Sequence, residues 1–277
     1  MILAGTDAAT HIEVTGSTPL IISVPHAGTA LPEELAARLT PLALTLPDTD
    51  WHVAALYDFA PALGATMLVA QYSRYLIDLN RPPDDAALYS AAPKTGLCPT
   101  RSFAGEPLYL AGDGALDAAE IEQRREQYWL PYHAALSTLL TRTRDRFGYA
   151  LLLDAHSIRS VVPRLFEGRL PHINVGTNQG SACTPALAEA LSARIDSQTR
   201  WSRVYNGRFT GGYITRYYGR PAFGVHAVQI ELAQSAYMDE SGTSYEPARA
   251  APLRELLGEI VAALLALPLK GSRPGRP

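Results

Sequence analysis

The feature that most constrains the fold is a set of short, mostly apolar segments that alternate with segments of helical spacing. The apolar segments are residues 20–24, 65–70, 149–154 and 226–232. A strand with one solvated face alternates polar and apolar residues, whereas a strand covered on both faces is apolar throughout. The segments between them, at 51–63, 117–147 and 184–195, have the spacing of covering helices. The pattern predicts an α/β fold with a mixed, mostly parallel sheet covered by helices on both faces.

Shorter segments complete the predicted organisation. Further strands are expected at 75–78 and 172–175, Asp117 is a good N-cap for the long helix, Pro131 should kink or split that helix, and helices are expected from about 251 to 267. No linker-like composition, repeat or charge block interrupts the chain, so we expect a single catalytic domain over residues 1–267. The basic, Gly- and Pro-rich residues 268–277 are expected to form a disordered tail.

Composition disfavours several classes of partner. The chain has 24 Lys and Arg against 27 Asp and Glu, a net charge of -3, whereas nucleic-acid-binding domains usually carry a basic surplus. The apolar run at 260–267 is far shorter than the ~20 residues of a membrane-spanning helix. The first residues lack the pattern of a secretory signal, so a cytoplasmic location is expected. A small polar substrate is favoured over nucleic acid or a membrane, and the oligomeric state is not indicated.

Polar side chains stand at or near the carboxyl ends of the predicted strands. They are His26, residues 78–81, residues 154–157 and Glu231. Ligands of open α/β sheets bind at the carboxyl ends of the strands. These side chains therefore define the predicted site.

Two of these segments suggest a metal site. In Asp154-Ala155-His156 an apolar strand presents a carboxylate and an imidazole on the same side, so that one can bind a metal while the other orients it. Neutral imidazole is a good zinc ligand, and catalytic zinc usually takes three protein ligands. His26 is a second candidate, although a structural histidine is equally compatible with its position. An acidic third ligand could come from Asp48 or Asp50, with the other carboxylate capping the following helix.

Other residue types point to an anionic substrate and a general base. Arg74, Asn80 and Arg81 stand close together in the sequence, and guanidinium groups bind carboxylates through two hydrogen bonds. The alternative is that Arg81 pairs with Asp78 or Asp84. A buried carboxylate such as Glu231 needs an ion-pair or hydrogen-bond partner, or has a catalytic role that explains its burial. It could be the general base beside a metal, or it could form a structural ion pair with Arg216.

Several ordered motifs together resemble the N-formylglutamate amidohydrolase family. The motifs lie at residues 23–28, 46–51, 73–83, 154–157, 206–216 and 226–232, so the resemblance spans nearly the whole chain. It implies hydrolysis of N-formyl-L-glutamate, a small dianionic amino-acid derivative, to formate and L-glutamate in histidine degradation. More distantly, the order of these motifs is similar to that of zinc carboxypeptidases and aspartoacylase, which implies a zinc-carboxypeptidase-like sheet.

The same resemblance implies roles for individual residues. One zinc ion (Zn2+) would bind His26, Asp50 and His156, with Asp48 as the alternative carboxylate. Glu231 would act as the general base. The substrate carboxylates would bind Arg74, Asn80, Arg81 and Arg216. One departure is that the third residue after His26 is Thr29, where the carboxypeptidases carry a glutamate ligand.

Three other functions compete with this interpretation. The first is another N-acyl amino-acid amidohydrolase or a carboxypeptidase-like zinc hydrolase. The second is a manganese ureohydrolase, whose Asp-x-His-x-Asp motif is interrupted here by Ile158. The third is a non-catalytic domain that binds carboxylates.

Overall fold

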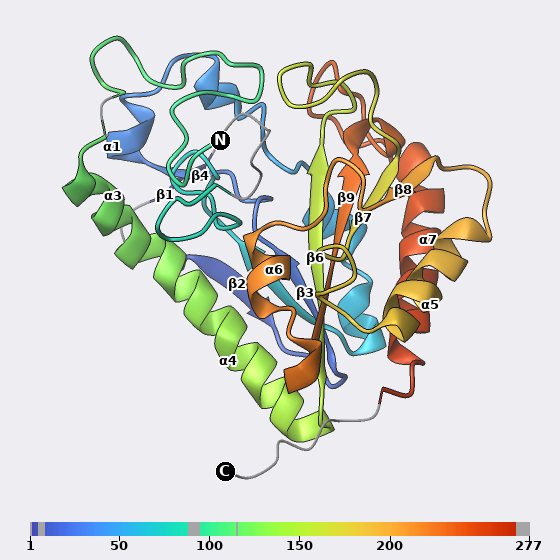
Figure 1. Cartoon of the computed structure of the whole chain (residues 1–277). Coiled ribbons are helices and arrows are strands. Elements are labelled where there is room, and N and C mark those ends of the chain that lie inside the picture. Colours follow the sequence, from blue (N-terminus) through green and yellow to red (C-terminus); the bar gives the residue numbers. More distant parts are fainter. Residues whose placement is uncertain (1, 5–8, 88–94, 115, 270–277) are drawn as a thin grey trace.

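A seven-stranded sheet forms the centre of the protein (Figure 1). The computed structural model describes residues 2–4, 9–87, 95–114 and 116–269, with side chains from residue 9 onward. The strand order is β2-β5-β3-β6-β9-β7-β8. The strands are β2 (His11–Val14), β3 (Leu20–Val24), β5 (Thr66–Ala70), β6 (Ala150–Ile158), β7 (Ile173–Gly176), β8 (Arg203–Tyr205) and β9 (Val225–Ala233). A separate pair joins β1 (Ile2–Ala4) to β4 (Ala30–Pro32).

The sheet is mixed and mostly parallel, which confirms the predicted fold class. Strands β5, β3, β6 and β9 run parallel, whereas β2 is antiparallel to β5 and β7 is antiparallel to β9. The two longest strands, β6 and β9, lie side by side in the middle. Their register pairs His156 with Glu231.

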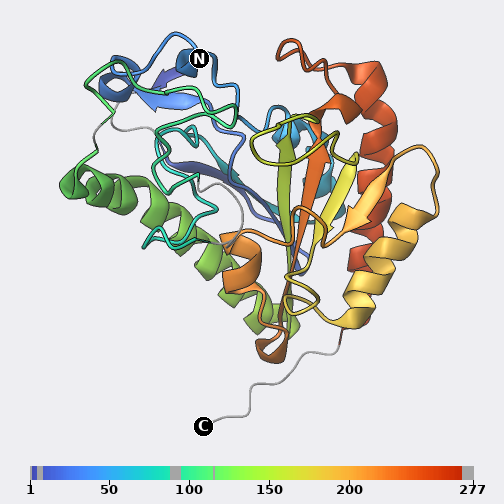
Figure 2. The same cartoon turned by 45° about the horizontal axis from the view of Figure 1, so that its top comes forward.

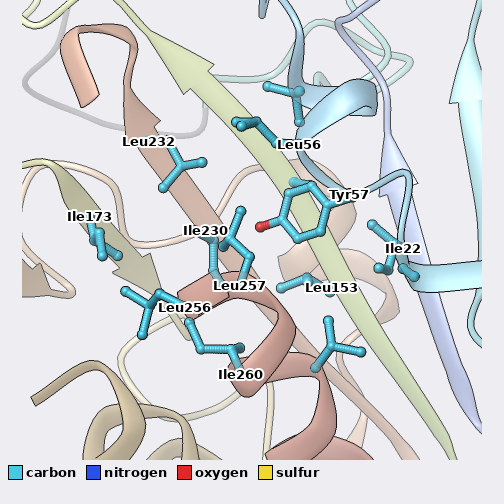
Figure 3. Close-up of a cluster of buried hydrophobic side chains, with 14 of the residues drawn as sticks. Ile22, Leu56, Tyr57, Leu153, Ile173, Ile230, Leu232, Leu256, Leu257 and Ile260 are labelled. Carbon is cyan, nitrogen blue, oxygen red and sulfur yellow. The ribbon is translucent and has the colours of Figure 1, made fainter. Parts of the chain in front are cut away.

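Helices cover both faces of the sheet (Figures 1 and 2). One face packs against α4 (Leu130–Phe147) and α6 (Tyr213–Tyr218), and the other against α2 (Val53–Leu56), α5 (Pro185–Asp196) and α7 (Pro247–Leu265). The first half of strand β6 is apolar on both faces, because Leu151 and Leu153 face one core and Leu152 faces the other. Figure 3 shows the first core, where Leu153 and Ile230 pack against Leu257.

Two predicted elements are wrong in form. Residues 51–63 do not make one helix. Helix α2 ends at Leu56, and a separate 3-10 turn follows at Ala60–Leu63. Pro61 lies at the start of this turn, where a backbone N–H has no partner to lose. Residues 75–78 are buried but form turns rather than a strand. In this segment the Leu76 N–H donates to the Ser73 carbonyl at 2.9 Å, which bends the chain after β5.

The long helical segment is interrupted close to the predicted place. Asp117 caps α3 (Ala118–Arg124), since its side chain accepts a hydrogen bond from the Glu120 N–H at 2.8 Å. A π-helical turn, Arg125–Trp129, then precedes α4, whose first turn contains Pro131. The remaining helix is α1 (Glu33–Ala36), and α7 is one helix although Pro252 lies in its first turns.

The predicted tail at 268–277 lies almost entirely outside the described residues. Within the described part of the chain, every helix is too short or too polar to cross a membrane.

Candidate active site

The predicted polar side chains meet at the carboxyl ends of the central strands. His26 follows β3, His156 and Glu231 lie opposite each other near the ends of β6 and β9, and Asp50 comes from the loop before α2. The Asp50 N–H donates to the His26 carbonyl at 3.0 Å, which fastens this loop to the end of β3. Segments far apart in the sequence are thus brought into one site.

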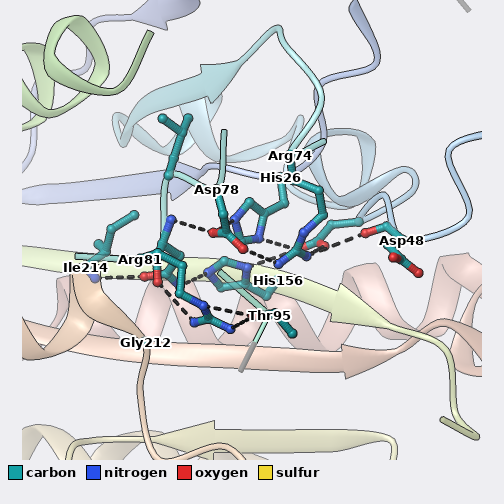
Figure 4. Close-up of polar contacts among 12 residues, drawn as sticks. His26, Asp48, Arg74, Asp78, Arg81, Thr95, His156, Gly212 and Ile214 are labelled. Atoms are coloured by element: carbon teal, nitrogen blue, oxygen red, sulfur yellow. Dashed lines mark hydrogen bonds and ion pairs between the residues drawn. The ribbon is translucent and has the colours of Figure 1, made fainter. Parts of the chain in front are cut away.

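A buried His–Asp–His group, made of His26, Asp50 and His156, forms the centre of this site. One potential ligand atom from each residue lies within 4.8 Å of the others. Asp50 Oδ2 is 2.9 Å from His156 Nδ1 and 3.7 Å from His26 Nδ1. The two imidazole rings lie 4.9 Å apart, centroid to centroid (Figure 4).

Two further carboxylates fix the orientation of the imidazoles. Asp78 Oδ1 is 2.7 Å from His26 Nε2, and His156 Nε2 lies 2.9 Å from Asn80 Nδ2 and 3.1 Å from Asp154 Oδ2. A carboxylate on the outer nitrogen of a histidine sets its tautomer and turns the other nitrogen toward a metal. Here both Nδ1 atoms turn toward Asp50.

The group fits a divalent metal ion. His26 Nδ1 is buried and has no hydrogen-bond partner among the described residues, although a buried polar atom normally has one. Two imidazole nitrogens and one carboxylate form a donor set typical of catalytic zinc. The unsatisfied nitrogen is the structural feature that a bound cation would explain.

The charges around this group favour an ionised Asp50. Burial alone would raise its pKa, but a hydrogen bond with His156 and electrostatic attraction to His26 and His156 hold the pKa of Asp50 below its ordinary value. Burial would lower the pKa of His156, yet Asp154 and Asp50 raise it well above the ordinary value. Binding of a metal ion, which needs a neutral imidazole, would compete with protonation of His156.

Asp48 does not join the His–Asp–His group. Its Oδ2 accepts a hydrogen bond from the Phe103 N–H at 2.7 Å, and burial raises the pKa of its carboxyl. The expectation that one of the two aspartates caps the next helix is wrong. Helix α2 follows His52, whose φ is 63°, and has no side-chain cap.

Glu231 is buried beside the His–Asp–His group. Its side chain accepts a hydrogen bond from Gln229 Nε2 at 3.2 Å. Burial raises the pKa of Glu231 to about 8, and the nearby charges of Asp50 and Asp154 act in the same direction. A carboxyl group with such a pKa can both accept and donate a proton near neutral pH.

Two of the predicted substrate-binding residues are already engaged with the protein. Arg74 is buried, 2.7 Å from Asp78 Oδ2 and 3.4 Å from Asp50 Oδ1. Asn80 Oδ1 accepts from the Ile214 N–H at 2.8 Å, and Asn80 Nδ2 lies 3.2 Å from Asp154 Oδ2. Both side chains therefore help to hold the residues around the His–Asp–His group.

Arg81 and Arg216 differ in their position. The Arg81 guanidinium is half-buried and donates twice to Thr95 Oγ1, at 3.0 and 2.6 Å, rather than pairing with Asp78 or Asp84 (Figure 4). Arg216 donates to the Gly211 carbonyl at 2.7 Å and to Thr210 Oγ1 at 2.8 Å. These bonds tie Arg216 to its own loop.

An open pocket brings most of the predicted residues together. Seven of the eight predicted site residues line it: His26, Asp50, Arg74, Asn80, Arg81, His156 and Glu231. Arg216 is outside that lining. Arg208, Phe209, Phe103 and Gln229 are lining residues that the sequence analysis did not select. Arg208 could have been found, because it is a cation within the 206–216 motif.

A family model for N-formylglutamate amidohydrolases matches residues 18–238. The chain belongs to the N-formylglutamate amidohydrolase family. It is 51% identical over 252 residues to the N-formylglutamate deformylase of Pseudomonas putida, an overlap of 91% of this chain and 94% of the relative. The corresponding protein of Pseudomonas aeruginosa is 52% identical over the same length, with the same coverage. Family membership makes the chain an amide hydrolase, as the motifs predict.

Solved structures agree with this family. The N-formylglutamate amidohydrolase of Ralstonia eutropha superposes with a TM-score of 0.79 at 25% identity, over 93% of this chain and 96% of that chain. A gene product of Agrobacterium tumefaciens shares the fold, with a TM-score of 0.69 at 21% identity, over 95% of this chain and 98% of that chain.

Proposed function

We propose that the protein hydrolyses the formyl amide of N-formyl-L-glutamate to formate and L-glutamate. We further propose that the reaction needs one divalent metal ion, which we expect to be zinc, held by His26, Asp50 and His156. The observation that carries the metal dependence is the unsatisfied His26 Nδ1, which faces Asp50 in a buried group beside Glu231. We assign the reaction to histidine degradation in the cytoplasm. The family and the relatives named above support the substrate.

A bound ion would supply Lewis-acid polarisation of the formyl carbonyl and make water a better nucleophile. The protein's own contribution begins with positioning. Asp78 and Asp154 contact the Nε2 atoms of His26 and His156, so that neither ring needs to reorient when the ion binds. Arg74 places a permanent positive charge beside Asp50, where the carbonyl oxygen gains negative charge during the reaction.

Glu231 would transfer the proton. Its Oε2 accepts from Gln229, which leaves Oε1 to accept the proton of the attacking water. The same oxygen then gives that proton to the amine nitrogen as the C–N bond breaks. A pKa raised by burial makes the Glu231 carboxylate a stronger base toward the proton of that water.

The substrate carboxylates would bind to arginines of the pocket lining. Arg81 and Arg208 line the pocket and bring guanidinium groups suited to two carboxylates. We assign Asn80 and Arg216 to positioning: Asn80 accepts from the Ile214 N–H in the first turn of α6, and Arg216 braces the loop before that helix. Arg74 would bind the carbonyl oxygen rather than a carboxylate.

A comparison of substrates tests the proposed function. Release of the free amino acid is measured with N-formyl-L-glutamate, N-formyl-L-alanine and N-acetyl-L-glutamate. We expect a preference of about 10²-fold or more for N-formyl-L-glutamate over N-formyl-L-alanine, because arginines left without a carboxylate are costly to desolvate. Equal rates for the two formyl substrates would contradict the assignment, and tight binding without turnover would favour the non-catalytic alternative.

The variant Arg81→Met tests the carboxylate site. We expect kcat/KM for N-formyl-L-glutamate to fall about 10²-fold, with a smaller fall for N-formyl-L-alanine, because one bidentate contact is lost. Arg200→Met is the matched control, since Arg200 is exposed and is not part of the pocket lining. A uniform fall for both substrates would mean that Arg81 only supports the fold.

A further inference from the structure

A second pocket shares a wall with the active-site pocket. It has a volume of about 300 Å³, and its lining combines apolar side chains such as Leu42, Val161 and Val162 with polar ones such as Asp48 and Arg159. Phe103 and Ile158 line both pockets. These two side chains therefore separate the reacting centre from a larger apolar space.

Phe103 is held in this wall by well-defined contacts. Its N–H donates to Asp48 Oδ2 at 2.7 Å, and the Arg74 guanidinium lies 4.6 Å from the centre of its ring. The loop around it is closed by the Ser102 N–H, which donates to the Glu106 carbonyl at 2.9 Å. The Phe103 ring also packs against the cluster that contains Ile158 and Val162.

With the substrate carboxylates bound toward Arg81, the wall would stand on the acyl side of the reacting amide. Figure 4 shows Arg81 and Asp48 on opposite sides of His26 and His156. The amine and acyl substituents of an amide leave its carbonyl carbon in different directions. If the glutamate part of the substrate binds toward Arg81, its acyl group points toward Asp48 and the Phe103 that Asp48 holds.

We propose that Phe103 restricts the acyl group to formyl, and that the apolar pocket behind it is an acyl-chain site that opens when this side chain is shortened. The inference rests on the proposed function. The reaction is unchanged in kind: water adds to the carbonyl, the C–N bond breaks, and a fatty acid replaces formate as the product. The class of added substrate is the N-acyl-L-glutamates with short, straight alkyl chains.

The test compares acyl chains of increasing length in matched variants. Glutamate release is measured with N-formyl-, N-acetyl-, N-butyryl- and N-hexanoyl-L-glutamate for the wild type, Phe103→Ala and Phe103→Leu. We expect kcat/KM for the hexanoyl substrate to rise about tenfold or more in Phe103→Ala, and by less in Phe103→Leu, since each methylene placed in an apolar pocket improves discrimination. If Phe103→Ala still releases formate but keeps the chain-length profile of the wild type, the proposal is wrong.

Two further variants locate the added space. Val161 is 46% exposed and lines only the second pocket, so Val161→Trp in the Phe103→Ala background should fill that pocket and remove the gain, while Val161→Trp alone should leave formate release unchanged. Phe209 lines only the active-site pocket, so Phe209→Ala should give no gain with the hexanoyl substrate. An equal gain in Phe209→Ala would overturn the proposal, because a merely loosened site would explain it.

A binding measurement separates this inference from the proposed function. Absence of formate release by the metal-loaded wild type would refute the proposed function. Calorimetric titration of Phe103→Ala and the wild type with N-hexanoyl-L-glutamate still tests the pocket, because tighter binding by the variant supports it and equal binding refutes it. If circular dichroism shows that Phe103→Ala does not fold, the same titration of Phe103→Leu decides.

Discussion

Glu231 is proposed to accept a proton and is also buried, and these two properties oppose each other. A carboxyl group accepts a proton only in its charged form, and burial of that charged form costs folding free energy. Burial raises its pKa from an ordinary value of 4.5 to about 8. The folded state therefore holds a proton that the unfolded state has lost between these two pH values. Through this residue, the stability of the metal-free protein decreases as pH rises across that range.

The variant Glu231→Gln tests how much stability the buried Glu231 carboxyl costs as pH rises. We expect the metal-free variant to gain stability relative to the metal-free wild type as pH rises from about 5 to about 8, while its formate release falls about 10²- to 10⁴-fold. Urea unfolding at pH 5, 6.5 and 8 measures the first effect. A stability difference that is the same at every pH would show that Glu231 is not buried with a raised pKa.

Gln229 connects Glu231 to the glycine loop before α6. Its Nε2 donates to Glu231 Oε2 at 3.2 Å, and its Oε1 accepts from the Gly212 N–H at 2.7 Å. We expect Gln229→Leu to lower kcat about tenfold with a smaller effect on KM, because Glu231 loses its orientation. In the Glu231→Gln background the same substitution should cause almost no further loss of kcat. Additive losses would mean that Gln229 acts independently of Glu231.

At the scale of elements, the site depends on how closely the end of β3 approaches the end of β5. A Cβ atom added to Gly28 would lie 2.3 Å from the Tyr72 carbonyl oxygen and 2.4 Å from the Gln71 carbonyl carbon. Both atoms belong to the backbone, so they cannot move aside cheaply. Gly28 therefore allows His26, two residues earlier, to reach the other metal-ligand candidates.

The variant Gly28→Ala tests this approach. We expect it to destabilise the protein by about 1–3 kcal/mol and to weaken zinc binding, because the segment that carries His26 must shift. Gly242→Ala is the control, since a Cβ there meets no atom within 4 Å. Thermal unfolding and zinc titration of both variants measure the effects. Unchanged zinc affinity in Gly28→Ala would show that His26 is positioned by other contacts.

The presence of the buried strands and their mostly parallel direction could be predicted from their apolar runs, whereas the order of the strands and the form of two other segments could not. Tyr75, Leu76 and Ile77 are as buried as strand residues, and an apolar run does not distinguish a buried turn from a strand. Residues 51–63 have helical spacing, but Pro61 stops the continuation of α2. Local spacing predicts burial more securely than it predicts backbone conformation.

The residue types of the site could also be predicted, but the role of each individual residue could not. Asp48 and Asp50 are two residues apart, and only the path of their loop sends one to the His–Asp–His group and the other to Phe103. Arg208 and Arg216 share one motif, and only the fold puts Arg208 in the pocket lining. Such choices depend on contacts between distant segments, which spacing alone does not encode.

At the scale of the whole molecule, the His–Asp–His group joins three segments that are distant in the sequence. The segments are the end of β3, the loop before α2 and strand β6. The net charge of -3 is compatible with a small anionic substrate because the positive side chains Arg74, Arg81 and Arg208 are gathered in the pocket. A metal ion at this group would both complete the site and tie these segments together.

Formate release from N-formyl-L-glutamate before and after removal of metal tests the central claim most directly. The enzyme is stripped with a chelator, and zinc is then added back in measured amounts. We expect activity to be lost on stripping and to return in full at one zinc ion per chain, with no return in an Asp50→Ala variant that remains folded. Full activity in the stripped wild-type protein would contradict the account.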